Sequence, residues 1–341
     1  MMNYLYLLVG AAIFLLTVAD VIKTTLSAQG GGAGTQLLAR TVWRGFFRAA
    51  GCRGTNRLLD YAGLAILLTV LLFWVAGMWG GLWLVLLSDA GSVVSSSTHL
   101  SASAVQKLYY AGYTLSTLGS GDYVPASDVW RLISNIGSFA GLIFITTSIT
   151  YFVPVLSAVN LQRQLSLYVS GMGASPTAIL ANAWDDTTLS SLFDAVPTLC
   201  QLLIEHTLNH YNYPVIHYFH SSQPRRAITL TVAKLDELHL LLTEVLAPDQ
   251  GQDQLKLAML RSALDEYYAV VPTSGAAGFG AGAAPPVPAT APLAAAGLAL
   301  LPVAEIERRL VAHQAHRARV RQMLHADGWD WMHVYPVAKS N

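Results

Sequence analysis

Charge is scarce in this sequence. Only 12% of the 341 residues are Asp, Glu, Lys or Arg, whereas 53% are hydrophobic, and the mean hydropathy is +0.44. Residues 61–88 and 132–162 contain no charged residue at all. Each stretch exceeds the roughly 20 residues that cross a hydrocarbon core about 30 Å thick. This composition excludes a wholly water-exposed protein and predicts two membrane spans.

An excess of positive charge is also absent. Twenty Lys and Arg residues balance twenty Asp and Glu, whereas proteins that bind a nucleic-acid backbone usually carry a basic excess. The two cysteines, Cys52 and Cys200, are too few for a structural zinc site. The sequence contains no catalytic triad, paired carboxylates or phosphate loop. We therefore predict no nucleic-acid partner, no enzyme activity and no cofactor, and we identify no small-molecule ligand.

Residues 4–19 form a third, shorter apolar run. A signal peptide is the alternative to a membrane span, but the start of the chain, MMNY, has no Lys or Arg, and no clear cleavage site follows. With Val21 and Ile22 included, a helix here reaches about 28 Å at 1.5 Å per residue. We expect a retained span.

Basic residues predict the orientation of the spans. Between Asp20 and Asp60 no acidic residue occurs, and six basic residues do: Lys23, Arg40, Arg44, Arg48, Arg53 and Arg57. The positive-inside rule makes this connector cytoplasmic. We therefore expect a multi-pass protein of the cell (inner) membrane, in contact with lipid, with its N-terminus outside and its C-terminus cytoplasmic.

Two features of the connector bear on its structure. Arg40, Arg44 and Arg48 recur every four residues beside an aromatic stripe, which is typical of a helix lying in the membrane interface. A loop whose arginines only set the topology is the alternative. The glycine-rich residues 30–34 predict a flexible hinge.

The chain after residue 160 follows a helical pattern. Apolar residues recur at spacings of three and four, without a run of alternating strands, and this predicts helices over 180–196, 198–210, 227–246, 254–271 and 304–326. The prolines, alanines and glycines of residues 272–303 predict a disordered linker. The expected parts are an N-terminal span and connector (1–56), a module of two spans (57–160), a helical cytoplasmic domain (161–271), the linker (272–303) and a last helix with a tail (304–341).

Residues 104–130, between the second and third spans, are too glycine-rich for another span and too apolar for an ordinary loop. A re-entrant loop satisfies both constraints, with residues 105–116 as a half-helix and 117–122 returning as extended chain. Non-helical backbone at membrane depth is tolerated where it is covered by protein or lines a water-filled path. Gly119 and Gly121 allow left-handed dihedrals, which can turn successive carbonyls toward one axis. Carbonyl oxygens on an axis replace the water around a cation.

The order of span, YTLSTLGSGD segment and span resembles the pore module of the potassium channel family over about residues 58–160. The resemblance implies a filter that offers potassium ions the carbonyls of Thr117, Leu118, Gly119 and Ser120, with Gly121 and Asp122 at its outer end. It also implies four subunits around the axis, because one chain contains one such loop. The expected protein is an all-α membrane protein with three transmembrane helices, a re-entrant pore loop between the second and third, and an all-α cytoplasmic domain. Its expected function is that of a passive, homotetrameric cation channel that conducts potassium.

Two positions in the third span are candidates for gating. Gly141 lies where inner helices of this family often carry a hinge glycine, and a packing glycine is the alternative. Pro154 removes one helical hydrogen bond and should bend the helix near its cytoplasmic end, and a helix end is the alternative there. No span carries the arginine ladder of a voltage sensor.

Ser120 departs from the family, whose filters usually carry Tyr or Phe at this position. Without that packing we expect weaker discrimination against sodium, unless Tyr109, Tyr110 and Tyr113 of the half-helix supply the support. Ser120 also leaves open a second class of protein, a non-conducting tetrameric receptor or scaffold with a degenerate pore module.

Two weaker signals lie in the C-terminal half. His206 and His210 share a helical face at a spacing that suits a metal ion or pH sensing, although ordinary packed or solvent-facing histidines are commoner. A set of arginines fits either anionic lipid or a solvated helix face: Arg308, Arg309, Arg317, Arg319 and Arg321.

Overall fold

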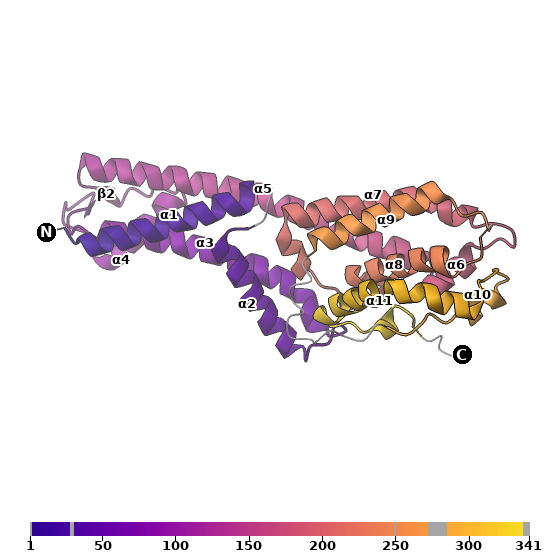
Figure 1. The fold of residues 1–341 in the computed structure, drawn as a ribbon. Helices are drawn as coiled ribbons and strands as arrows, with labels where there is room; N and C mark the ends of the chain where they lie inside the picture. Colours follow the sequence, from indigo (N-terminus) through magenta and orange to yellow (C-terminus); the bar gives the residue numbers. More distant parts are fainter. Residues whose placement is uncertain (1, 28–30, 249, 272–284, 337–341) are drawn as a thin grey trace. The chain divides into compact units, whose positions relative to one another are not determined.

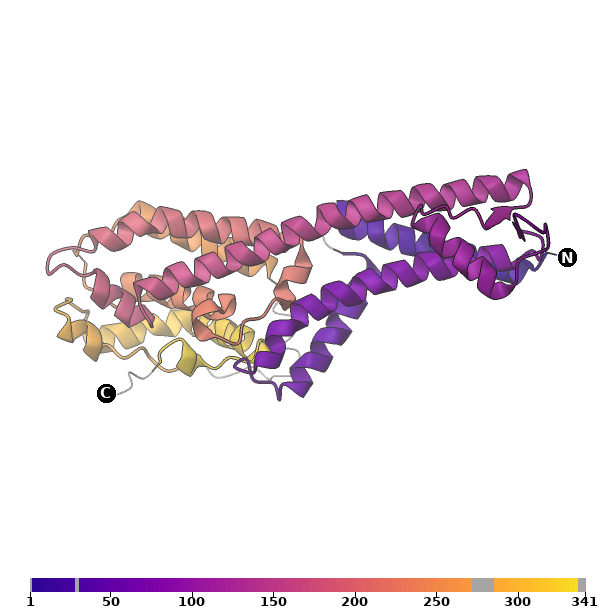
Figure 2. The same cartoon turned by 180° about the vertical axis from the view of Figure 1, so that it is seen from behind.

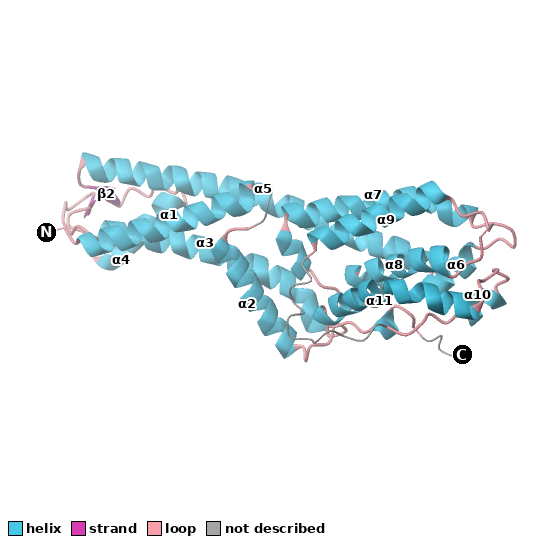
Figure 3. Ribbon diagram, in the orientation of Figure 1, coloured by secondary structure: helices cyan, strands magenta, loops and turns pink. Residues whose placement is uncertain are grey.

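The structure, a computed structural model, describes residues 2–27, 31–248, 250–271 and 285–336. The described chain is mostly helical (Figures 1 and 3). It divides into two compact units. The membrane unit comprises Met1–Val42 and Leu64–Leu156, and the C-terminal unit comprises Trp43–Gly63 and Ser157–Asn341.

Among the described residues, three helical segments are long and apolar enough to cross a membrane. They are α1 (Tyr4–Leu26), the segment Arg57–Leu87 with η1 (Arg57–Tyr61) and α3 (Ala62–Leu87), and α5 (Asp128–Met172). The predicted fold class, three long apolar helices with a pore region and a further helical region, is confirmed.

Small residues let α1 lie close to α3 in the membrane unit. A Cβ atom at Gly10 would lie 2.7 Å from the Leu84 Cβ, and one at Gly81 would lie 2.8 Å from the Phe14 backbone nitrogen. Glycine at such positions lets helix backbones approach closely where lipid supplies no hydrophobic driving force. The N-terminal span is therefore packed against the pore module of its own chain.

The carboxylate of Asp20 on α1 ties three elements of the membrane unit together. It accepts hydrogen bonds from the Gly34 amide (2.9 Å), the Thr35 hydroxyl (2.6 Å) and Trp74 Nε1 of α3 (3.0 Å). Gly34 and Thr35 belong to the first turn of α2 (Ala33–Ala49), so the carboxylate satisfies free amide groups at that helix N-terminus.

The expectations for the connector are corrected in two ways. The loop alternative for the arginine stripe is wrong, because Arg40, Arg44 and Arg48 lie on α2. The flexible hinge is wrong for the described part of residues 30–34, since the Gly32 amide donates to the Thr24 hydroxyl (2.8 Å) and helix begins at Ala33.

The third long helix, α5, continues well past the expected span and is drawn as one uninterrupted ribbon in Figures 1 and 2. Its 45 residues end at Met172. The extension forms because Leu165 and Val169, spaced four apart, are fully buried in the core of the C-terminal unit.

Helices also make up the rest of the C-terminal unit. Their bounds are α6 Pro176–Ala183, α7 Ser190–Asn212, α8 Ile228–Glu244, α9 Gln254–Val270, α10 Ala291–Ala295 and α11 Val303–Ala326, with short turns η2 Pro214–Tyr218, η3 Pro224–Arg226 and η5 Trp331–His333. Helix α7 packs along α9, and α8 contacts α6, α9 and α11 (Figure 1). Thirteen of the 17 residues of α8 are buried, so α8 is the central helix of this unit.

The predicted helices 180–196 and 198–210 are divided at the wrong place. The chain breaks after α6, where the Asp185 carboxylate accepts from the amides of Thr187 and Thr188 (2.9 and 2.6 Å), a local turn that competes with helix. Helix α7 instead runs through Pro197, because Val196 and Leu199 on either side are buried in the core.

The prediction of a disordered linker is wrong for residues 285–303, while residues 272–284 lie outside the described residues. Leu293 of α10 and Leu298 are buried in the core, and Leu246 and Leu300 form a β-bridge. A composition rich in Pro, Ala and Gly therefore did not prevent order once a few leucines could be buried.

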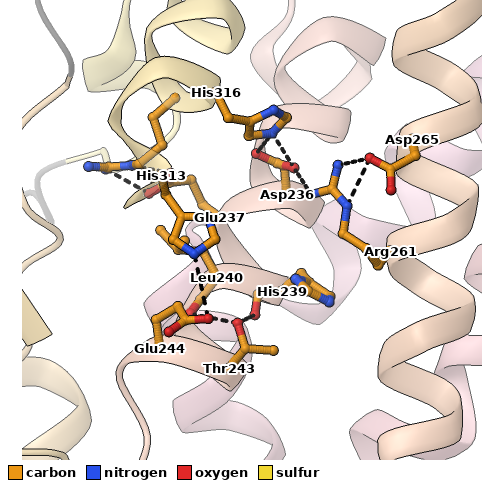
Figure 4. A network of polar contacts seen from close by, with 11 residues as sticks. Asp236, Glu237, His239, Leu240, Thr243, Glu244, Arg261, Asp265, His313 and His316 are labelled. Atoms are coloured by element: carbon orange, nitrogen blue, oxygen red, sulfur yellow. Dashed lines mark hydrogen bonds and ion pairs between the residues drawn. The ribbon is translucent and has the colours of Figure 1, made fainter. Parts of the chain in front are cut away.

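Ion pairs join the helices inside the C-terminal unit. Asp236 of α8 lies 3.2 Å from Arg261 Nη1 of α9 and 2.9 Å from His316 Nε2 of α11, and Arg261 also pairs with Asp265 (Figure 4). The neighbouring Glu237 pairs with Arg317, as described below. Charged groups thus connect the central helix to the helices around it.

Arg317, one of the arginines expected to face lipid or solvent, is instead buried. Arg317 donates to both carboxylate oxygens of Glu237 (2.7 and 3.0 Å), and the side chains of this pair are only 2% and 0% exposed. The Tyr335 hydroxyl also donates to Glu237 (2.9 Å). Arg317 therefore has a structural contact in place of either surface role, while Arg308 and Arg309 pair with Glu305.

Candidate pore and filter

The half-helix before the filter is α4 (Ala104–Leu115), close to the predicted 105–116. A capping box defines its start. The Gln106 amide donates to Ser103 Oγ (3.4 Å), and the Ser103 amide donates to Gln106 Oε1 (2.7 Å). The sequence signal for this start is Ser-x-x-Gln before an apolar run.

The loop that follows α4 has an alternating backbone. Thr117, Gly119 and Gly121 have positive φ angles of 58°, 58° and 79°, whereas Leu118 and Ser120 between them do not. The predicted left-handed dihedrals of the two glycines are confirmed. Alternation of the φ sign at every second residue turns successive peptide planes the same way, so neighbouring carbonyls can share one side of the chain.

A small two-stranded antiparallel sheet holds the outer end of this loop. Strand β1 (Val93–Ser95) pairs antiparallel with β2 (Tyr123–Pro125), and the Ser96 amide donates to the Asp122 carbonyl (2.9 Å). Three-residue strands are too short for sequence periodicity to predict. This pairing fixes where the chain leaves the loop.

Tyrosines of α4 contact the back of the loop. The Tyr109 hydroxyl donates to Ser120 Oγ (3.2 Å) and lies 3.5 Å from an Asp122 carboxylate oxygen. The Tyr113 hydroxyl donates to the Tyr123 carbonyl, and its ring lies 5.2 Å from the Tyr109 ring. The structure thus places tyrosines where the sequence offered them as the alternative support for Ser120.

The loop itself faces open space within one chain. All residues from 116 to 122 are exposed, Leu118 to 71%, and a Cβ at Gly119 or Gly121 would meet nothing within 4 Å. Beside it, a cavity of about 470 Å³ is lined by Tyr113, Thr117 and Ser134 among others. The surface that a filter would present to ions and to neighbouring subunits is uncovered in the monomer.

Gly141 lies against the end of the pore helix. A Cβ at this position would overlap the Leu115 carbonyl oxygen, and the Ser138 hydroxyl one turn earlier donates to the Thr114 carbonyl (3.1 Å). This contact supports the packing alternative for Gly141.

Pro154 lies inside α5 and not at its end, so the helix-end alternative is wrong. Its ring removes one backbone hydrogen bond from a continuous helix.

Sequence reasoning missed the buried ammonium of Lys107 on α4. Lys107 is 2% exposed, and Nζ donates to the carbonyls of Leu86 (3.1 Å), Asp89 (2.5 Å) and Ala90 (3.1 Å) at and beyond the end of α3. A cation suits this place because the C-terminal carbonyls of a helix are unpaired and carry partial negative charge. The sequence does contain a signal for this role. Between Asp89 and Asp122, Lys107 is the single Asp, Glu, Lys or Arg residue in a segment of mostly apolar and hydroxyl-bearing residues.

The histidines singled out in the C-terminal half are core residues. His206 is 1% and His210 is 6% exposed, and burial lowers their pKa values to about 4 and about 3. His206 stacks on Tyr267 with ring centroids 5.9 Å apart. Within the part of the chain that the structure describes, no cluster of three His, Cys, Asp or Glu residues suits a metal ion.

Two long helices that flank a half-helix and an alternating loop define a pore-loop module. The chain matches the ion channel family over residues 69–158. It is 31% identical over 275 residues to a protein of Bacillus subtilis (strain 168), named uncharacterized membrane protein YdjJ, and the match covers 80% of each chain. The chain therefore belongs to the ion channel family and is a membrane protein. No solved structure matches it with significance.

Proposed function

We propose that this protein is a passive, homotetrameric channel that conducts potassium through a filter made by residues 117–122 of four chains. The observation that carries the proposal is the alternation of positive φ at Thr117, Gly119 and Gly121 in an exposed loop. Four residues, Thr117 to Ser120, span at most about 13 Å at roughly 3.3 Å each. This length fits several consecutive carbonyl sites that replace the hydration shell of potassium.

Tyr109 supports potassium preference despite the serine in the filter. Its hydroxyl holds Ser120 and lies near Asp122, and Tyr113 anchors Tyr123 just beyond the filter. These bonds restrain the backbone that an aromatic residue at position 120 would otherwise brace. We therefore favour a filter whose selectivity depends on Tyr109 over one that is intrinsically loose.

Asp122 makes the outer mouth acidic. Its side chain is exposed, and four copies around one axis would concentrate cations and exclude anions. The proposed orientation, with this mouth outside and the C-terminus in the cytoplasm, is tested by reporters at Ser96 and at the C-terminus. The same location for both reporters would contradict it.

Reversal potentials in planar bilayers test conduction and selectivity together. Under potassium/sodium and potassium/chloride gradients, we expect wild type to prefer potassium and to exclude chloride. Tyr109→Phe keeps the ring but removes the hydroxyl, so its preference for potassium over sodium should fall. The matched control is Tyr110→Phe, because the Tyr110 hydroxyl bonds Ser134 of α5 (2.6 Å) and not the filter.

Three outcomes contradict this account. A chloride current would exclude the cation filter, and equal selectivity in both tyrosine variants would remove the role of Tyr109. A tetramer without any flux would favour the non-conducting receptor or scaffold.

For gating, we propose Pro154 as the hinge and assign Gly141 to packing. Pro154→Ala is expected to alter the open probability of the channel but not its ion preference.

A further inference from the structure

The central helix of the C-terminal unit carries three buried charged residues, and one of them stands alone. Asp236 and Glu237 of α8 are each held by ion pairs. Lys234, on the same helix, is only 5% exposed. Among the described residues, no carboxylate or hydrogen-bond acceptor partners its ammonium group. Nζ is not among the fully buried side-chain atoms that lack a partner, so it meets solvent through the pocket that Lys234 lines. A mostly buried ammonium with no carboxylate beside it favours a counter-charge from outside the chain.

Lys234 lines a pocket of about 660 Å³ in this unit. Three other segments of the chain contribute to the pocket: the end of α5 and the residue run after it, the η3 turn, and the tail around η5. Of the lining residues that the structure describes, Lys234 is buried, while the others are half-buried or exposed. The ammonium-bearing side chain therefore belongs to the floor of the pocket, below walls that meet solvent.

The charge of the pocket is positive. Arg225 lines it together with Lys234, and none of the described lining residues is acidic. The nearby Asp330 carboxylate lies 3.4 Å from His325 Nε2. Burial lowers the pKa of Lys234, and no carboxylate acts to raise it again. The Ser170 hydroxyl, also in the lining, donates to the Arg225 carbonyl (3.0 Å) and so fixes the turn that carries Arg225.

The remaining walls are apolar. They consist of Ala174, Pro224, Met332 and Pro336. Pockets of 300–1,000 Å³ with mostly apolar walls and a few placed polar groups are typical of small-molecule sites. A cationic floor with apolar walls selects a ligand that is itself amphipathic.

We propose that this pocket binds a small organic anion, with its phosphate or carboxylate group at Lys234 and its apolar body along Ala174, Pro224, Met332 and Pro336. The anion supplies the counter-charge that Lys234 lacks, and exposed Arg225 adds a second cationic contact at the rim. The site goes beyond the proposed conduction of ions, and its test measures binding alone. A failure of the filter proposal therefore leaves this proposal intact.

Isothermal titration calorimetry of the full chain in phosphatidylcholine nanodiscs tests the site. The probes are phenyl phosphate and benzoate, with uncharged benzyl alcohol as control and empty nanodiscs as blank. We expect at least one anion to bind and benzyl alcohol not to bind. Lys234→Met should weaken anion binding about tenfold or more, since a charge-assisted hydrogen bond is lost. Arg226→Gln, which changes an exposed arginine outside the pocket lining, should leave binding unchanged.

The variants also separate binding from folding. Lys234→Met removes an unpaired buried charge and keeps an unbranched apolar chain, so its melting temperature should not fall. Arg225→Gln changes an exposed side chain and should weaken binding several-fold without affecting folding. No binding of either anion at millimolar concentration, equal binding of benzyl alcohol, or binding that both variants leave unchanged would overturn the proposal. If phosphatidylglycerol in the nanodiscs competes with the probe, the source of the anion is a lipid headgroup. If it does not compete, the source is a soluble anion.

Discussion

Charged side chains that are buried or half-buried have different kinds of partners in the two units of this protein. In the membrane unit, the half-buried Asp20 is surrounded by neutral donors from Gly34, Thr35 and Trp74, and the buried Lys107 by backbone carbonyls. In the C-terminal unit, buried carboxylates meet side chains of opposite charge, as in the pairs of Asp236 with Arg261 and Glu237 with Arg317.

The difference follows from the surroundings of each unit. Every additional charged residue in a lipid-exposed segment is expensive, so a lone charge there is satisfied by helix ends, hydroxyls and indole groups that are already present. A water-exposed unit can carry many charges at low cost, and a few of them become paired as the core forms. Removing one charged side chain therefore leaves an unpaired opposite charge in the C-terminal unit, but it leaves only neutral hydrogen-bonding groups in the membrane unit.

The largest expected effect comes from breaking the most buried pair. Arg317→Met leaves the Glu237 carboxylate 0% exposed with only the Tyr335 hydroxyl to stabilise it. We expect the free energy of unfolding of the C-terminal unit to fall by about 3–5 kcal/mol, measured by denaturant titration. The double variant Glu237→Leu with Arg317→Met should recover most of this loss.

Arg308→Met is the matched control. Arg308 pairs with Glu305 at the surface, where its side chain is 73% exposed, and such pairs contribute little. Equal losses for Arg308→Met and Arg317→Met would show that burial does not decide the strength of these pairs, and the contrast between the units would fail.

Local signals predicted much of the fold and of the pore. Charge-free runs predicted the long helices, and the order of Thr, Gly and Gly predicted the left-handed positions of Gly119 and Gly121, because both depend on residues close in sequence. What could not be predicted depends on distant partners. Glu237 and Arg317 are 80 residues apart, and the burial of Leu293 depends on a core built from other helices.

The same limit applies inside the filter. The sequence shows that Ser120 lacks an aromatic ring and that three tyrosines precede it, but not which hydroxyl reaches it. Only the packing of α4 against the loop selects Tyr109 for that bond and directs Tyr110 to Ser134.

The second prediction concerns how the stability of the C-terminal unit depends on pH. His220 has an acceptor at each ring nitrogen, Asp327 at Nδ1 (3.1 Å) and the Gly54 carbonyl at Nε2 (2.7 Å). Burial alone would lower the pKa of His220, but Asp327, the Gly54 carbonyl and Asp60 together raise it above its ordinary value. Burial works to raise the pKa of Asp327, yet His220 and the Thr229 hydroxyl hold it below its ordinary value.

The sign of the effect follows from these directions. The folded unit holds the His220 proton more tightly than the unfolded chain, so this stabilisation is present at low pH and is lost as pH rises through the raised pKa. His206 and His210, with lowered pKa values of about 4 and about 3, act oppositely and destabilise the unit as pH falls. Denaturation midpoints should therefore decline as pH rises above about 6.5, the ordinary pKa of histidine, and His220→Gln should flatten that decline. A decline of the same size in the variant would exclude His220 as its origin.

The smallest expected effect is in the membrane unit. It tests the comparison where a buried charged group has neutral partners. Lys107→Met removes the ammonium that serves three carbonyls around the end of α3. The carbonyls are neutral, and the nearby half-buried Asp89 carboxylate keeps its hydrogen bond from Trp130 Nε1 (3.1 Å), so we expect a loss of about 1–3 kcal/mol, smaller than for Arg317→Met. Unfolding by SDS titration in mixed micelles measures it. The control is Lys23→Met, which changes an exposed lysine in the last turn of α1 and should have little effect. A loss for Lys107→Met as large as that for Arg317→Met would mean that neutral partners bind a buried charge as strongly as an opposite charge does.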